Sequence, residues 1–117
     1  MDNIEIYFSE DNEITELSVI ESECRSDVII KIGNSYYNPL IITPARLTVN
    51  FKYMIKEFGF YECRPCLILV IDLKKETIVN TIIKLHKNNY FSQIKPIDFE
   101  KYCTHYLSNF NEWVKVY

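Results

Sequence analysis

The spacing of apolar residues changes along this chain, from alternation before residue 43 to a helical repeat after it. Residues 4–8 and 28–32 place apolar side chains at every second position, which indicates strands with one buried face. Residues 43–59 instead repeat apolar side chains every three to four positions, as one face of a helix requires. Strands followed by helices are typical of an α+β fold. We therefore expect a mainly antiparallel sheet, built from N-terminal hairpins and packed against two or three helices.

Two hairpins are predicted in this first part of the chain. Residues 13–20 fit the spacing of either a strand or a helix, and we favour a strand that pairs with residues 4–8. Gly33-Asn34 suits the positive φ angles of a tight turn after residue 32. The return strand is predicted over residues 36–42, and Pro39 predicts that it is an edge strand or carries a bulge.

The best-marked element is a helix between Thr43 and Gly59. Thr43 is a good N-cap, Pro44 fits the first helical position, and Gly59 supplies a left-handed stop. Phe60, just beyond the glycine, is expected to fold back on the apolar side of the helix. That side is one stripe of five residues: Leu47, Phe51, Met54, Ile55 and Phe58.

The remaining elements complete one domain over residues 1–117, the commonest size for a single core. Residues 66–71 are apolar on both faces and predict a central strand. Residues 74–87 predict a second helix with Ile78, Ile82 and Leu85 inward, and Asp98 is a cap for a third helix. Residues 111–117 fit a last strand, with a helix as the alternative.

Charge is strongly segregated along the chain. Residues 1–27 hold nine acidic side chains and one base, Arg25, which gives this segment a net charge of −8. Residues 28–117 hold twelve bases and seven acids, which gives them +5, so the overall −3 hides the asymmetry. An acidic face of this kind speeds the capture of a basic partner, whereas a solubility role is the alternative.

Several classes of function are disfavoured by the composition. The acidic start of the chain does not resemble a secretory signal, and no apolar run is long enough for a membrane span, so we expect a cytoplasmic protein. The two glycines, Gly33 and Gly59, are isolated, which disfavours a phosphate-binding loop. His86 and His105 are the only histidines, and neither has an orienting carboxylate nearby in the sequence. We predict no enzymatic activity and no cofactor.

Cys63-Arg64-Pro65-Cys66 is the sharpest local motif and supports an alternative function. A Cys-x-x-Cys pair is found in redox disulfides and in zinc sites. A redox cysteine requires a helix N-terminus, whereas this pair precedes a strand. A zinc site requires two further ligands, for which Cys24 or the Cys103–His105 segment is available. Two structural thiols are the preferred interpretation, so no metal site is predicted.

A second alternative is binding of nucleic acid by a basic and aromatic region in the second half of the chain. Its residues are Lys74, Lys75, Lys84, Lys87 and Lys95 together with Tyr90 and Phe91. Nucleic-acid-binding domains are usually basic overall, whereas this chain has an isoelectric point near 5.4. A solvated helix face is therefore preferred, and no direct contact with nucleic acid is predicted.

The acidic segment is the predicted binding site for a basic protein, such as a nuclease that holds a phosphate backbone. Tyrosines are common anchors in protein interfaces, and Tyr36, Tyr37, Tyr53 and Tyr61 are available for that role. Homo-oligomerisation is left open by the sequence. The predicted partner-binding acids are Glu10, Asp11, Glu13, Glu16, Glu21, Glu23 and Asp27.

In overall character the chain resembles the small bacterial immunity proteins of contact-dependent growth inhibition and related polymorphic toxin systems. The likeness extends over the whole length: a small acidic domain, rich in Ile, Asn, Lys and Tyr, without a catalytic motif. The resemblance implies an antitoxin role, in which the protein covers the substrate-binding surface of one cognate toxin, often a nuclease. It assigns no site residues to this chain.

Overall fold

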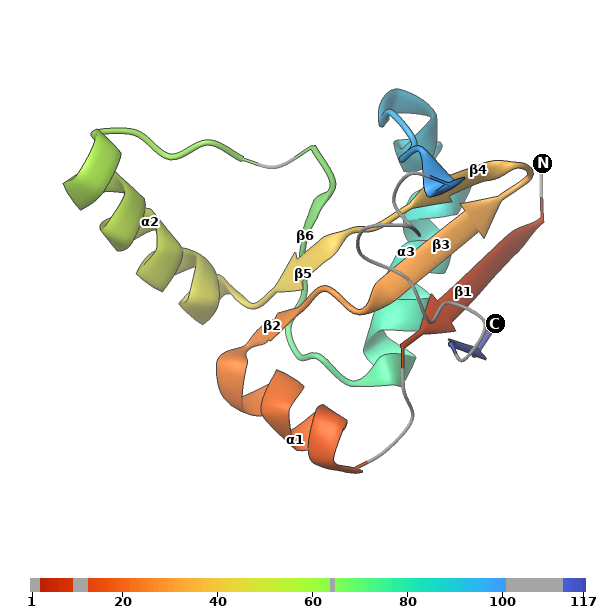
Figure 1. The fold of residues 1–117 in the computed structure, drawn as a ribbon, viewed down its shortest axis with the longest axis horizontal. Helices are drawn as coiled ribbons and strands as arrows, with labels where there is room; N and C mark the ends of the chain where they lie inside the picture. The colour runs from red at the N-terminus through yellow and green to blue at the C-terminus, as the bar shows by residue number, and fades with distance from the viewer. Residues whose placement is uncertain (1–2, 10–12, 64, 101–112) are drawn as a thin grey trace.

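The computed structural model describes residues 3–9, 13–63, 65–100 and 113–117, with the backbone alone at residues 13–15. Within these residues the chain has an α+β fold of two small sheets and three α-helices (Figure 1). The expected fold class is confirmed. None of the described helices combines the length and apolar character that crossing a bilayer requires.

The larger sheet is antiparallel and has the order β4-β3-β1-β7. It consists of β1 (Ile4–Phe8), β3 (Val28–Ile32), β4 (Ser35–Tyr37) and β7 (Val114–Lys115). Ile6 pairs with Ile30 and Phe8 with Val28, and all four side chains are buried in the core. The alternation predicted for residues 4–8 and the Gly33-Asn34 turn are confirmed, with Gly33 at φ +60°. The single buried face predicted for residues 28–32 is wrong, because Ile29 on the other face of β3 is fully buried as well. The C-terminal tail contributes β7, which confirms the predicted last strand and not the helix given as its alternative.

The predicted first hairpin is wrong, because residues 13–20 belong to a helix, α1 (Glu13–Ser22). Glu16 and Val19, three positions apart, lie half-buried on the side of the helix that faces the body of the molecule. Leu17 and Ile20 are exposed instead. An acid occupies an inward position because it pairs with a buried arginine, and this pairing removes the usual apolar signal of a helix.

The smaller sheet has the order β2-β5-β6 and consists of β2 (Cys24–Arg25), β5 (Leu40–Ile42) and β6 (Leu67–Leu69). The predicted return strand over residues 36–42 is wrong as one element, because it divides at Asn38 and Pro39 between the two sheets. The Asn38 side chain donates hydrogen bonds to the carbonyls of Ser26 and Val28, 2.9 and 2.7 Å away. These bonds hold the chain where it leaves one sheet for the other.

The prediction of a central strand over residues 66–71 is also wrong about the position of the strand in its sheet. β6 is an edge strand, parallel to β5, and it is paired on one side only among the described strands. Ile68 and Val70 point into the core, whereas Leu69 and Ile71 point outward and are exposed. A parallel pair requires a crossover connection, and here that connection contains a helix.

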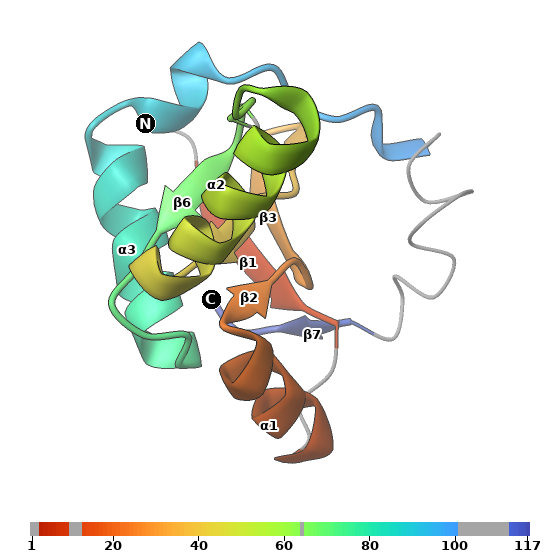
Figure 2. The same ribbon diagram turned by 90° about the vertical axis from the view of Figure 1, so that its left-hand side faces the viewer.

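This crossover helix, α2 (Pro44–Phe58), has the predicted ends. The Thr43 hydroxyl accepts a hydrogen bond from the Arg46 amide, and Gly59, at φ +79°, donates its N–H to the Ile55 carbonyl. No residue of α2 is buried, and Phe60 is exposed rather than folded back on the stripe. Figures 1 and 2 show that α2 leaves β5 at an angle and stands apart from both sheets.

α3 (Lys75–Lys87) lies on the other side of the smaller sheet from α2 and closes the core (Figure 1). Ile78 and Ile82 are fully buried, as predicted, and Leu85 packs against the core. A 3-10 helix, η1 (Tyr90–Gln93), follows and buries Phe91. Most of the helix predicted after Asp98 falls on residues 101–112, outside the described residues.

Candidate functional site

The predicted acidic site is centred on α1 and the strand that follows it. Glu10 and Asp11 lie outside the described residues, and Glu13 begins α1 with only its backbone described. Glu16 is on the inner side of α1, and Asp27 lies between β2 and β3. The structure therefore gathers part of the predicted set around one short helix.

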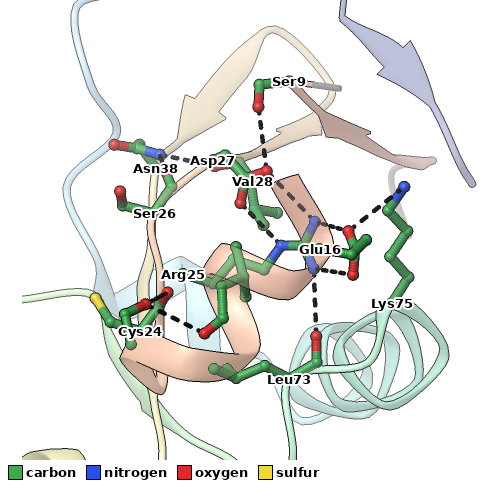
Figure 3. Close-up of polar contacts among 12 residues, drawn as sticks. Ser9, Glu16, Cys24, Arg25, Ser26, Asp27, Val28, Asn38, Leu73 and Lys75 are labelled. Atoms are coloured by element: carbon green, nitrogen blue, oxygen red, sulfur yellow. Dashed lines mark hydrogen bonds and ion pairs between the residues drawn. The ribbon is translucent and has the colours of Figure 1, made fainter. Parts of the chain in front are cut away.

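Arg25, the single base of the acidic segment, organises this region (Figure 3). Its side chain is fully buried, and its Nη2 lies 2.6 Å from Glu16 Oε1 and its Nε 2.8 Å from Asp27 Oδ1. Nη1 also donates to the Leu73 carbonyl at 3.2 Å. Glu16 and Asp27 thus have a structural role inside the molecule. We did not foresee this role, although a lone arginine among nine acids is a signal that could have indicated it.

The charge of Arg25 is well compensated where it lies. Burial lowers its pKa, but the Glu16 hydrogen bonds and the Asp27 carboxylate outweigh burial and raise the pKa above the ordinary value. The guanidinium also lies 4.6 Å from the centre of the Phe8 ring. Lys75 Nζ approaches Glu16 Oε1 at 3.7 Å and so ties α3 to the same cluster. These contacts fasten α1 to the sheets and to α3.

The outward side of α1 has a different character. Glu21 is exposed on the last turn, and Glu23 follows the helix in a left-handed conformation, half-buried. Leu17 and Ile20 are exposed beside them, with 60% and 53% of each residue accessible. On such a surface the acids attract a basic protein partner by their negative charge, and the exposed apolar side chains provide contact area.

The tyrosines proposed as anchors differ in their availability. Tyr37 is buried, and the Tyr36 ring stacks on Phe99 with 3.8 Å between ring centres. Tyr61 is half-buried and its ring centre lies 6.2 Å from that of Phe51. Tyr53, on α2, is the exposed member of the four. Most of these rings therefore contribute to packing within the chain.

Cys63 and Cys66 are not joined in a disulfide, and the first is exposed and the second half-buried. Cys66 immediately precedes β6, so it does not lie at a helix N-terminus. Cys66 lines a pocket of about 160 Å³ together with Asn38 and Lys95. Burial, followed by the neighbouring Cys66, raises the pKa of the Tyr90 hydroxyl. Across the described residues, no three His, Cys, Asp or Glu side chains converge as metal ligands would.

The basic and aromatic region exposes four of its lysines, Lys74, Lys84, Lys87 and Lys95, but not its aromatic rings. Phe91 is buried in the core and Tyr90 is half-buried, so neither ring is free to stack on a base. Lys75 is held by Glu16. His86 is half-buried near the end of α3, where it lines a pocket of about 320 Å³ with Asn89 and Ser92. His105 lies outside the described residues.

The second unusual surface is the apolar stripe of α2, which we had expected to be covered. Phe51 and Phe58 are 50% and 58% exposed, and Ile55 is exposed between them. Arg46, near the start of the helix, donates to the Ser22 carbonyl at 3.2 Å and links α2 to the end of α1. Large exposed apolar patches of this kind usually mark interaction surfaces.

No protein-family model, curated protein or solved structure matches the chain. The described residues define an α+β domain with two helices that expose apolar side chains, the acidic α1 and the basic α2.

Proposed function

We propose that this chain is a cytoplasmic protein-binding domain of the immunity type, which neutralises a basic toxin by covering the surface that holds the toxin's substrate. The toxin is a nuclease in this proposal, because enzymes that hold a phosphate backbone present basic surfaces. An acidic domain competes for the same surface by its charge.

The observation that carries the proposal is the outward side of α1. Glu21 is exposed and the neighbouring Glu23 is half-buried, while Glu16 is held inward by Arg25. Leu17 and Ile20 stand exposed beside these acids. Charge brings a basic partner to the surface, and desolvated apolar side chains hold it there. We assign contact to the outward residues and a positioning role to Glu16 and Asp27.

The experiment is co-expression with the product of the gene immediately upstream, followed by purification and measurement of association by surface plasmon resonance. The test variant carries Glu13→Lys, Glu21→Lys and Glu23→Lys. The matched control carries Glu57→Lys, Glu62→Lys and Glu76→Lys, three acids outside the acidic segment, of which the side chains are exposed. Both variants change the net charge equally, and both leave Glu16 in place.

The α1 variant should associate at least tenfold more slowly and show a weaker dependence on salt, because the steering field is lost. It should also fail to relieve toxicity in the co-expressing cell. The control should behave as the unaltered protein does. Equal association rates and equal salt dependence for the two variants would remove α1 as the binding surface.

A further inference from the structure

Among the described residues, the outward side of β6, the edge strand of the smaller sheet, lacks a covering layer, whereas Ile42 of the neighbouring β5 is fully buried. A helix that connects two parallel strands normally packs on the face of their sheet. Here α2 connects β5 to β6, yet none of its residues is buried. The outward face of β6 is open as well, since Leu69 is exposed and Ile71 is 88% exposed. The chain therefore carries an exposed apolar stripe on α2 and an exposed apolar side of β6 that do not cover each other.

We infer that a second copy of this chain covers this surface, with the α2 of each copy lying against the outward face of β6 of the other. A two-fold axis makes such an exchange self-completing, because the helix of each copy meets the sheet of its partner. The apolar packing that would hold α2 on its own sheet is then made between the two chains.

The size of the exposed surface supports a dimer. The exposed residues of the apolar stripe of α2, the residue after Gly59 and the outward side chains on and just after β6 are Phe51, Ile55, Phe58, Phe60, Leu69 and Ile71. With roughly 150–200 Å² for a large apolar side chain, their exposed fractions amount to about 500–700 Å². The largest apolar patch of a typical monomer is about 300–600 Å². Complete burial of these residues in two copies would cover about 1,000–1,400 Å², at the lower end of what specific interfaces bury, about 1,200–2,000 Å².

The position of this surface leaves the acidic helix free. Figure 2 shows α2 in front of the smaller sheet, with α1 at the lower end of the molecule. Arg46 joins the first turn of α2 to the end of α1, but the apolar stripe continues away from that contact towards Phe58. The dimer therefore does not depend on the proposed function, and each inference can fail without the other.

The test is the molar mass of the purified chain, measured by light scattering and by sedimentation equilibrium over a range of concentrations. The unaltered chain should have twice its 14.0 kDa mass. The variant Phe51→Glu with Phe58→Glu should have the mass of one chain, because it places charges in the centre of the stripe. The matched control, Val49→Glu with Tyr53→Glu, alters two residues on the opposite side of α2 that are each 60% exposed, and it should remain a dimer.

A second measurement needs no variant, which matters if the stripe variant does not fold. The melting temperature of a dimer rises with protein concentration, whereas that of a monomer is constant. We expect a rise for the unaltered chain. A single-chain mass at every concentration, with a constant melting temperature, would overturn the inference. A dimer that persists in the folded stripe variant would also overturn it, because the contact would then lie elsewhere.

Discussion

Arg25 has the most demanding environment of any charged residue in the described part of the chain. It is 1% exposed, and both its ion-pair partners come from the acidic segment. Buried pairs of this kind contribute little compared with an apolar replacement of the whole cluster, but the loss of one member is costly. The arginine is therefore a structural requirement of a segment that otherwise consists mostly of acids and apolar residues.

We predict that Arg25→Met lowers the free energy of unfolding by about 2–4 kcal/mol, because Glu16 and Asp27 lose their buried partner. Their partial contact with water keeps the loss below that of a fully buried pair. Urea unfolding followed by circular dichroism measures the change. Arg46→Met, at a half-exposed site, is the control and should cost about 0–1 kcal/mol. Adding Glu16→Gln and Asp27→Asn to Arg25→Met should recover part of the loss.

A carboxylate on β1 gives the fold a second, weaker dependence on charge. Hydrogen bonds from Lys115 and then from Tyr7 hold the pKa of Glu5 below its ordinary value of 4.5. Lys115 lies on β7, 3.0 Å from Glu5 Oε1. A lowered pKa means that the stabilising contribution is present above about pH 4.5 and is lost as the pH falls through the folded-state value.

We therefore predict that β7 loosens from β1 as the pH falls through the lowered pKa of Glu5, while the rest of the sheet stays intact. The Val116 amide, which donates to the Ile6 carbonyl at 2.8 Å, should report this change in an NMR pH titration. Glu5→Gln should abolish the titration in that range. If the Val116 signal moves identically in the two proteins, another group controls the attachment of β7.

Among the elements, α2 shows which properties of a helix can be predicted from its own residues. Its first and last residues follow from Thr43, Pro44 and Gly59, each of which acts within one turn of the backbone. The stripe of apolar residues is equally clear in the sequence. Which residues pack against the stripe, however, depends on segments that are distant in the sequence. The helix was therefore predictable, and its exposure was not.

We predict that Gly59→Ala lowers the free energy of unfolding by about 1 kcal/mol, because alanine is strained at φ +79°. No atom lies within 4 Å of the added Cβ, so the cost comes from the backbone alone. Thermal unfolding measures it. Thr48→Ala, at an exposed position inside the same helix, is the control and should leave the stability equal or slightly higher. Equal stability of the glycine variant would contradict the left-handed cap.

At the scale of the whole molecule, the charge segregation and the open apolar surface belong to different helices. α1 carries the exposed acid of the N-terminal segment, and α2 carries the exposed aromatic stripe. Two separate surfaces allow one molecule to bind a basic protein and a copy of itself at the same time.

If both inferences hold, the complex contains two copies of this chain and two partner molecules. Native mass spectrometry of the co-purified complex measures this composition. The variant Phe51→Glu with Phe58→Glu should give a complex with one copy of each, because it separates the chains and leaves α1 unchanged. A one-to-one complex formed by the unaltered chain would show that partner binding excludes the dimer.

The elements that the sequence alone determined are those governed by neighbours along the chain. The alternation of Ile6 and Phe8, the Gly33-Asn34 turn, the caps of α2 and the buried face of α3 are set by local backbone and side-chain preferences. The tertiary structure decided the helical state of α1, the division of the strand at Pro39 and the edge position of β6. Each of these depends on tertiary contacts that the spacing of apolar residues does not indicate, such as the buried Arg25, which pairs with Glu16 and also donates to the carbonyl of Leu73, 48 residues away.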